Sequence, residues 1–497
     1  MKNNKLSWKK QYSYLIRLVN RYPTYRRFFL FLVCFGISTL IFFFRNPDAF
    51  INPVFYTEDG QDYIGPIFTR GFWSTFFTTH RGYHTFGNIL LSGLAVVINN
   101  IFRAGDILFL PQSIAIVSYM FYALVATLPV LLLSNKIRSH YLVTLALISS
   151  FFPLNGSDYE VIGRISNVGY AFFYIAFVLV AYRIFCIKRS YFVFLIDSAL
   201  FLCANTNPVV FLLIPTIYIQ YAKSIFIDKT PFNVIRKNPN FISAIILSVF
   251  LLLQGVKVFL GGVIDQQPGY LDSPFVYSNA IEMLIARSIL YPIIHPIYAY
   301  FNDAITILVF AFLIMVFVLF SKKANYGLYA LGFYALFTFT IMAAIFRPGL
   351  SEVFQDYQGI PGLWARFYYG QNLLAIFLIV LLFHDIASRI KLLAYRRLLM
   401  LLMLAIFLVG WSGVSSYGNP SHPMRDIGNF EQTLVAALSE RRFVDASGIL
   451  DTNGRFLEIP IYPTKTDHLW TIVIPRELAE KSVVNQGKLM NSMSKCK

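Results

Sequence analysis

Apolar residues occur along this chain in long continuous runs, and short polar segments separate one run from the next. A helix that crosses the hydrocarbon core of a bilayer needs about 20 consecutive apolar residues. The runs therefore predict about eleven membrane-spanning helices. Their expected ranges are 27–45, 109–133, 140–153, 168–187, 190–204, 208–222, 241–262, 304–320, 326–346, 367–384 and 398–417.

The run NILLSGLAVVINNIF, residues 88–102, is a further candidate, but it is short and lies close to the next run. Its assignment decides the side of every later loop. Cytoplasmic loops carry an excess of Lys and Arg. If residues 88–102 lie flat at the outer interface, most basic clusters, among them NKIRSH, IKRS and SRIKLLAYRR, fall on the cytoplasmic side. We therefore expect this run not to cross. The runs 190–204 and 208–222 are also short, and they either cross or re-enter.

The composition is that of a multi-span membrane protein. Of the 497 residues, 57% are hydrophobic and 17% are aromatic, whereas only 13% are charged. The formal charge of +17 could indicate a nucleic-acid partner, but the basic residues sit in short clusters that orient membrane segments, so none is expected. The first run ends at Arg45-Asn46-Pro47 without a small-residue cleavage site, which favours a retained anchor over a signal peptide. No CxxC pairing indicates a metal site or disulfide framework.

These observations predict an all-α polytopic membrane protein with an inner, basic N-terminus, residues 1–26, and a membrane domain, residues 27–417. The tail, residues 418–497, has ordinary soluble composition and strand-like segments RFLEIPIYP and LWTIVIP, so we expect a small outer α/β appendage. The expected outer loops are residues 46–108, 154–167, 263–303 and 347–366.

The first outer loop carries three carboxylates in the stretch NPVFYTEDGQDYIG: Glu58, Asp59 and Asp62. The plain interpretation is a solvated turn at Asp59-Gly60. A second outer loop contains LNGSDYEVIGRISN, with Asp158, Glu160 and Arg164.

Acids from these two loops could meet in one interfacial cleft. There a carboxylate could take a proton from a sugar hydroxyl or hold a divalent cation, Mg²⁺ or Mn²⁺. Separate solvated loops are the competing interpretation.

A third outer segment, LWARFYYG, leads into the span at 367–384 and contains Arg366. Aromatic residues at that depth often form only the interfacial belt, and an arginine there often extends its head group to water. A planar guanidinium is also suited to a lipid phosphate, which it binds with two parallel hydrogen bonds. Arg366 is therefore the leading phosphate candidate.

Two charges lie deeper, Asp197 in YFVFLIDSALFL and Lys257 in LLLQGVKVFLGG. Lys257 is near enough to the outer end to reach the surface and is a weaker phosphate candidate, whereas Asp197 receives no role. His80 and His84 have a spacing that could suit a metal, but no acidic third ligand is near in sequence. Arg81 between them is a further phosphate candidate, as is Arg164.

At this point the chain resembles the GT-C glycosyltransferases, polytopic enzymes that use polyprenyl-phosphate-linked sugars and carry an acidic motif in the first outer loop. TEDGQDYIG with the following RGY matches that arrangement. DYE with Arg164 and Asn167 resembles the second acidic loop, and LWARFYYG resembles the Arg-aromatic start of a late span. Within that class the chain is most similar to the phage-encoded O-antigen glucosyltransferases of the Gtr type. The tail has no counterpart in this resemblance.

The resemblance implies undecaprenyl-phosphate glucose as the donor and lipopolysaccharide O-antigen as the acceptor, on the periplasmic side of a bacterial inner membrane. It implies a base at Glu58 or Asp59 and a phosphate contact at Arg366. A companion flippase and a donor-lipid synthase would supply the donor. No Gly-rich phosphate loop is present, which agrees with a lipid-linked rather than a nucleotide-linked donor.

Two other classes remain open. An O-antigen polymerase or ligase works on the same side with similar lipids, but it would be expected to rely on arginine-rich outer loops. A flippase or other transporter often shows pseudo-symmetric halves and ionisable residues near the midplane. Here the acids concentrate in the outer loops, which favours the transferase.

Overall fold

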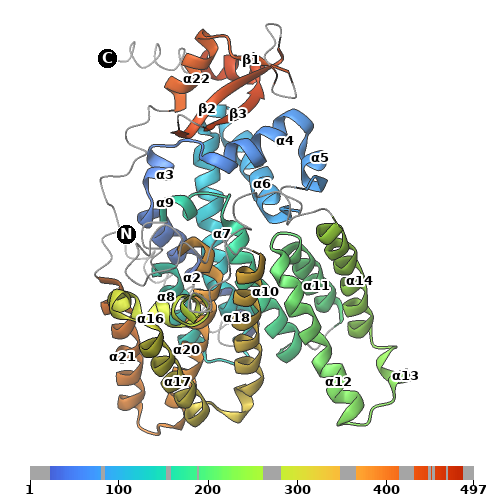
Figure 1. Ribbon diagram of the computed structural model, residues 1–497, viewed down its shortest axis with the longest axis vertical. Helices are drawn as coiled ribbons and strands as arrows, with labels where there is room; N and C mark the ends of the chain where they lie inside the picture. The colour runs from blue at the N-terminus through green and yellow to red at the C-terminus, as the bar shows by residue number, and fades with distance from the viewer. Residues whose placement is uncertain are drawn as a thin grey trace, which may run out of the picture.

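Three long helices form the centre of the molecule: α7 (Leu110–Leu132), α10 (Val168–Phe185) and α20 (Tyr369–Arg389) (Figure 1). Nearly every side chain of α20 is buried, as expected for a helix that is apolar on all faces. The structure is a computed structural model. It describes residues 23–79, 84–152, 158–186, 190–260, 281–346, 365–412, 430–445, 449, 454–465 and 468–484.

Further helices surround this centre. The first helix, α2, packs against α7 and α8, whereas α11 packs against α10 and α14 (Figure 1). On the other side, α18 and α21 pack against α20. The bounds of these helices are α2 (Pro23–Arg45), α8 (Ser139–Phe151), α11 (Ser190–Ala204), α12 (Ile219–Phe226), α14 (Pro239–Leu260), α17 (Asp303–Phe320), α18 (Tyr326–Phe346) and α21 (Leu393–Ser412).

Short helices connect the long ones. The α-helical connectors are α3 (Asp48–Ile51), α4 (Gly65–Arg70), α5 (Phe72–Phe77), α9 (Asp158–Val161), α13 (Phe232–Ile235) and α16 (Tyr291–Ile294). The 3₁₀ segments are η2 (Ile107–Phe109), η3 (Pro208–Tyr218), η5 (His295–Tyr300), η6 (Lys323–Asn325) and η7 (Ala365–Tyr368). Two segments, η1 (Asp59–Ile64) and η4 (Glu282–Leu290), are π-helices.

Seven helical segments of the described chain are long and apolar enough to cross a membrane. They are residues Tyr25–Arg45, Phe86–Arg103, Ile107–Leu132, Val168–Phe185, Pro208–Phe226, Asp303–Phe320 and Arg366–Arg389. Most of α17 and α2 is not buried by protein, so their apolar side chains face outward, as they do in a bilayer. The protein is therefore membrane-embedded and helical. The described residues of each of the eleven predicted ranges are helical, but α8 and α11 are shorter than a typical span, so a count of eleven stays a prediction.

The run 88–102 forms the helix α6 (Phe86–Arg103). Its first turn meets the loop after α11, since Phe86 N donates to Asn205 O at 3.4 Å and Gly87 N donates to Thr206 Oγ1 at 2.8 Å. The segment after α6 contacts the C-terminal part of the chain, since Ile107 N donates to Ser482 Oγ at 3.1 Å. The helix thus continues beyond the ends of α10 and α11 rather than running alongside them (Figure 1).

The deep charge Asp197 has a partner that the sequence did not indicate. Arg183 donates from Nε to Asp197 Oδ1 at 2.6 Å and from Nη2 to Oδ2 at 3.1 Å, and both side chains are buried. Ser243 Oγ also donates to Asp197 Oδ2, at 2.5 Å. A buried carboxylate is tolerated when it is paired and hydrogen-bonded in this way, so Asp197 links α10, α11 and α14.

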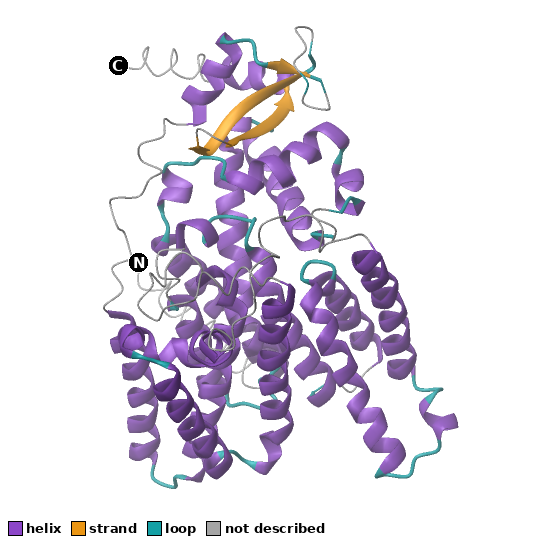
Figure 2. Ribbon diagram, viewed as in Figure 1, coloured by secondary structure: helices purple, strands orange, loops and turns teal. Residues whose placement is uncertain are grey.

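Both predicted strands of the tail are present. Strands β1 (Phe443–Val444), β2 (Phe456–Lys465) and β3 (His468–Pro475) form an antiparallel sheet in the order β1-β2-β3 (Figure 2). The helix α22 (Phe430–Ser439) packs against β2. The pairing of β2 with β3 is irregular between Pro460 and Thr464, where a proline cannot donate to the ladder. This domain sits on η1 and α4 at one end of the molecule (Figure 1).

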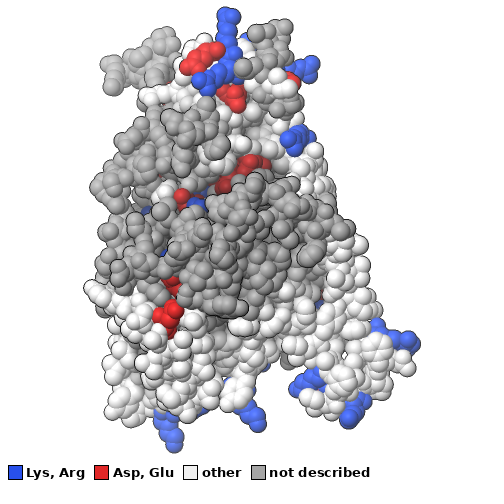
Figure 3. Space-filling view, viewed as in Figure 1, with Lys and Arg blue, Asp and Glu red and all other residues white. Residues whose placement is uncertain are grey.

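Charge is distributed unevenly along the molecule. On the face drawn in Figure 3, Lys and Arg side chains appear at both ends of the molecule, whereas Asp and Glu appear near mid-height and toward the sheet but not at the end opposite it. This is the distribution expected of a protein that crosses a bilayer between a basic and a mixed-charge side.

Candidate functional site

The three carboxylates of the first loop lie on or beside a π-helix. Glu58 precedes η1, which carries Asp59 and Asp62 and ends where Gly65 N donates to Gly60 O. Thr57, just before it, has a positive φ of 27°, which is uncommon for a non-glycine residue. The π-helix is rare and is frequently found at functional sites. The predicted turn at Asp59-Gly60 is therefore a helical segment.

Asp59 is the most enclosed of these acids, with 1% of its surface exposed. Its Oδ1 accepts hydrogen bonds from Ile165 N at 3.0 Å and Ser166 N at 2.6 Å. Its Oδ2 accepts none from the part of the chain that the structure describes. Burial raises the pKa of Asp59 to about 7, although the charge of Arg164 and the two amides oppose this shift and Glu58 adds to it. A base with such a pKa is matched to neutral pH.

Glu58 and Asp62 are less enclosed than Asp59 and are both partly buried. Tyr56 lies close to Glu58, and the charges that shift its pKa identify the other ionisable residues nearby. Burial raises the pKa of Tyr56, Tyr159 and Glu58 raise it further, and Arg366 and Arg164 lower it. Glu58 and Arg366 therefore lie within electrostatic reach of one tyrosine.

The second and third loops meet in an ion pair between Glu160 and Arg366. Tyr159 donates its hydroxyl to Glu160 Oε1 at 3.2 Å, and Asn167 Nδ2 donates to the main-chain oxygen of Glu160 at 2.9 Å. The Arg366 guanidinium also stacks on the ring of Phe367, 5.1 Å from its centroid. The Arg366 side chain is 23% exposed, so it is only partly enclosed by the loops.

Arg164 ties the first loop to the second. Its Nη1 donates to Val54 O at 2.8 Å, its Nε donates to Tyr159 O at 3.5 Å, and it lies 5.2 Å from the ring centroid of Tyr56. The residue is 1% exposed. Arg164 therefore lies among the loops that it joins, where its charge acts on Asp59, and its predicted phosphate contact stays a prediction.

Asp158 pairs with a different arginine from the one that pairs with its neighbour Glu160. It forms a buried ion pair with Arg45 at the end of α2, and Arg45 also donates to Ser150 O at 2.7 Å. Asn46 Nδ2 donates to Ile162 O at 2.6 Å beside this pair. The pair therefore fixes the second loop to the first helix, whereas the sequence suggested an acid on the acceptor or metal side.

A second charged cluster, not anticipated from the sequence, lies on the π-helix η4. Tyr298 donates its hydroxyl to Glu282, and Arg287 lies 4.9 Å from the Tyr298 ring centroid. Asn372 Nδ2 donates to the main-chain oxygen of Arg287 at 2.6 Å. Glu282 and Arg287 are both buried. The signal was present in the sequence EMLIAR, an acid and an arginine within an apolar segment of an outer loop.

Several predicted residues lie outside this account. Arg81 and His80 lie outside the described residues, as does the side chain of Lys257. His84 is buried, with its ring 4.8 Å from that of Phe86.

Among the described residues, no group of three or more His, Cys, Asp or Glu side chains could hold a metal ion. The chemistry proposed below uses no metal ion.

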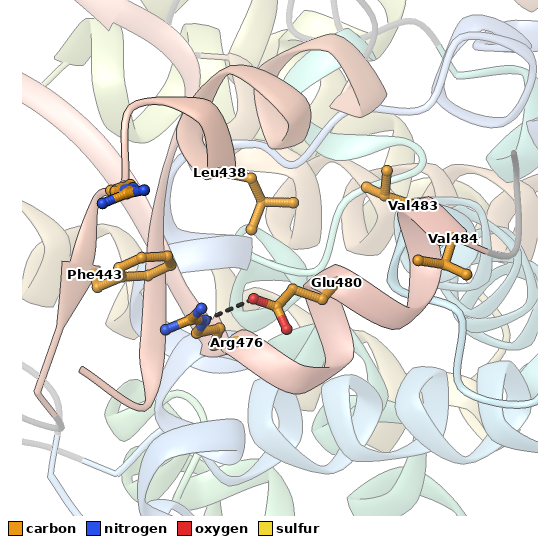
Figure 4. A pocket seen from close by; sticks show the side chains of 7 residues that line it. Leu438, Phe443, Arg476, Glu480, Val483 and Val484 are labelled. Carbon is orange, nitrogen blue, oxygen red and sulfur yellow. Dashed lines mark hydrogen bonds and ion pairs between the residues drawn. The ribbon is translucent and has the colours of Figure 1, made fainter. Parts of the chain in front are cut away.

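The C-terminal domain has a shallow pocket of about 550 Å³, lined by Leu438, Arg441, Phe443, Arg476, Glu480, Val483 and Val484 (Figure 4). Arg476 donates from Nε to Glu480 Oε1 at 2.7 Å and covers the ring of Phe443 at 4.2 Å (Figure 4). Every lining residue belongs to this domain, whereas Asp59, Glu160 and Arg366 lie in the helical part. The pocket is therefore distinct from the carboxylate site.

No protein-family model and no curated protein matches the chain. The GT-C likeness therefore rests on the sequence motifs and stays a prediction.

Proposed function

We propose that the protein is a membrane glycosyltransferase that moves glucose, or another hexose, from undecaprenyl phosphate to lipopolysaccharide O-antigen. One observation carries the proposal. The second loop contacts both a buried carboxylate with a pKa near neutrality, Asp59, through the amides of Ile165 and Ser166, and a partly exposed arginine, Arg366, through Glu160. This pairing supplies a base for a sugar hydroxyl and a cation for a phosphate leaving group.

In the proposed reaction the acceptor hydroxyl oxygen attacks the anomeric carbon of the lipid-linked sugar. Asp59 takes the hydroxyl proton, for which the uncommitted Oδ2 is available while Oδ1 is held by the amides of Ile165 and Ser166. The bond between the anomeric carbon and the phosphate oxygen breaks, and its electron pair goes to the phosphate. Asp59 is favoured over Glu58 as the base because its carboxylate is anchored at one oxygen.

Arg366 would contact the phosphate as negative charge develops on it. A guanidinium has five N–H donors in a planar fork, a geometry suited to phosphate oxygens. The ion pair with Glu160 and the stacking on Phe367 hold the group in one orientation, which reduces the reorganisation needed when substrate binds.

The proposed orientation places the C-terminal sheet and the acids in the periplasm and the N-terminus in the cytoplasm of a bacterial inner membrane. The basic end opposite the sheet supports this assignment through the excess of Lys and Arg in cytoplasmic loops (Figure 3). The lipid-linked donor would then meet the O-antigen on the outer side.

A transporter is the main alternative from another class. Transporters bind substrate at ionisable groups near the midplane. The deep acid Asp197 is already held by Arg183 and Ser243, so both of its carboxylate oxygens are engaged within the protein. An O-antigen polymerase or ligase would use the same side and similar lipids, and only the reaction product separates it from a transferase.

Mass spectrometry of O-antigen sugars, in cells with and without the chain, tests the proposal. We expect one additional hexose per repeat in cells that carry the wild-type chain. Cells that carry Asp59→Asn should have the same O-antigen as cells without the chain. A change in O-antigen chain length without an added hexose would indicate the polymerase or ligase instead.

A further inference from the structure

The β2–β3 hairpin of the C-terminal domain lies directly on the π-helix that carries Asp59. A Cβ added at Gly60 would lie 2.5 Å from Ile461 Cδ1 on β2, 3.4 Å from Ile472 Cβ on β3 and 3.5 Å from Phe55 Cβ. Ile461 and Ile472 are both buried. No side chain larger than hydrogen fits at position 60 while Ile461 keeps its place.

The same contact continues along the helix and beyond it. A Cβ at Gly65 would lie 3.5 Å from Val473 N and 3.6 Å from Val473 O, so the main chain of β3 covers the end of η1. The rings of Phe55 and Phe430 meet edge to face, with centroids 4.8 Å apart. The hairpin and α22, the helix that precedes it in sequence, therefore both lie against the first loop.

The opposite side of η1 is fixed by Asp59 itself, through the hydrogen bonds from Ile165 N and Ser166 N. The π-helix is thus enclosed between the hairpin on one side and the second loop on the other. Because Asp59 and Gly60 are adjacent, a displacement at Gly60 moves the Asp59 carboxylate relative to these two amides. A π-helix is an uncommon conformation, and uncommon backbone conformations persist where the surrounding structure enforces them.

We propose that the β2–β3 hairpin positions the Asp59 carboxylate against the second loop, and that Gly60 and Ile461 are the positioning pair. The C-terminal domain then has a defined part in the reaction although it holds none of the reacting groups. This inference rests on the proposed function for its effect on catalysis, whereas the structural contact can be tested without it.

A double-mutant cycle tests the pair. Gly60→Ala adds the Cβ that meets Ile461 Cδ1, and Ile461→Val removes that Cδ1 atom. We expect Gly60→Ala to lower sugar transfer by roughly tenfold or more, since small misplacements of a catalytic group are costly, and Ile461→Val to have little effect. The double variant should recover to within about threefold of wild type.

The pH profile adds a signature that general loss of stability would not produce. Loss of the amide hydrogen bonds removes two interactions that favour the charged carboxylate, so in Gly60→Ala the midpoint of activity should move to higher pH and in the double variant it should return. Gly36→Ala in α2, where no atom lies within 4 Å of an added Cβ, is the matched control. Failure of the double variant to recover would overturn the proposal.

Hydrogen exchange separates this inference from the proposed function. In the purified protein, peptides that contain Ile165 and Ser166 should exchange faster in Gly60→Ala than in wild type, and the double variant should restore their protection. A wild-type protein without transferase activity would refute the proposed function, but the exchange pattern would still test whether the hairpin positions the second loop. Unchanged exchange in these peptides, or faster exchange throughout the chain, would contradict that positioning role.

Discussion

Glu160 forms an ion pair with Arg366, although 206 residues separate them in sequence. The pair joins the loop that contains Glu160 to the start of α20, one of the three central helices. Because Arg366 also lies within electrostatic reach of Tyr56, the first loop belongs to the same site. Glu160 and Arg366, from segments far apart in sequence, thus lie together beside the first loop.

Arg366→Lys is expected to lower transfer by about 100-fold or more, because lysine keeps the positive charge but loses the planar two-pronged grip on phosphate. The measurement is the rate of hexose transfer by purified variants. Arg389→Lys is the matched control, since Arg389 stands at the other end of α20 and donates to Leu319 O and Ser321 O. Full activity of Arg366→Lys would argue against a bidentate phosphate contact.

Asp59→Asn is expected to lower transfer by about 10² to 10⁴-fold, roughly 3 to 5 kcal/mol of barrier, because the amide cannot accept the proton. Its Oδ1 can still accept from Ile165 N and Ser166 N, so folding should be retained. Glu58→Gln is the matched variant and should retain more activity. The opposite result, with Glu58→Gln inactive and Asp59→Asn active, would assign the base to Glu58.

The activity of the wild-type protein should fall as the pH decreases through about 7, because the pKa of Asp59 is raised to that value and the base must be deprotonated. The free energy of unfolding should respond to pH in the opposite direction. Between the ordinary carboxyl pKa and about 7 the folded state holds more protons than the unfolded state, so the free energy of unfolding decreases as the pH rises. Asp59→Asn should remove this contribution from thermal melts recorded across that range. An activity midpoint near pH 4 would contradict the raised pKa.

Asp197→Ala should destabilise the protein by roughly 3 to 5 kcal/mol, because it leaves the buried guanidinium of Arg183 without its carboxylate. Thermal stability in detergent is the measurement. The double variant Arg183→Met with Asp197→Ala should recover part of the loss, since no unpaired charge is then buried. Equal stability of Asp197→Ala and wild type would indicate that water reaches Arg183.

Membrane orientation can be tested with reporter fusions at six sites. We expect a cytoplasmic signal after residues Ser139, Arg189 and Lys323 and a periplasmic signal after residues Asn167, Pro348 and Asn419. A cytoplasmic signal after Asn167, with a periplasmic first loop, would contradict the site, because Asp59 contacts the main chain at Ile165 and Ser166.

The sequence predicted the helical body because apolar runs report burial or lipid contact directly, and it predicted both strands of the tail from their alternation. It could not predict which charges pair. Arg45 with Asp158 and Arg183 with Asp197 are set by how helices pack, which periodicity does not encode. The π-helical form of η1 was also missed, because Asp59-Gly60 is equally compatible with a turn and the hairpin that encloses it is distant in sequence.

The most direct test of the central claim is a transfer assay with purified, detergent-solubilised wild-type protein, undecaprenyl-phosphate glucose and isolated O-antigen. A transferase needs no bilayer, whereas a transporter has no second compartment to deliver substrate to in detergent. Mass spectrometry should detect O-antigen that carries an added hexose together with free undecaprenyl phosphate, and Asp59→Asn should form neither. A folded wild-type protein that leaves both donor and acceptor unchanged would contradict the account.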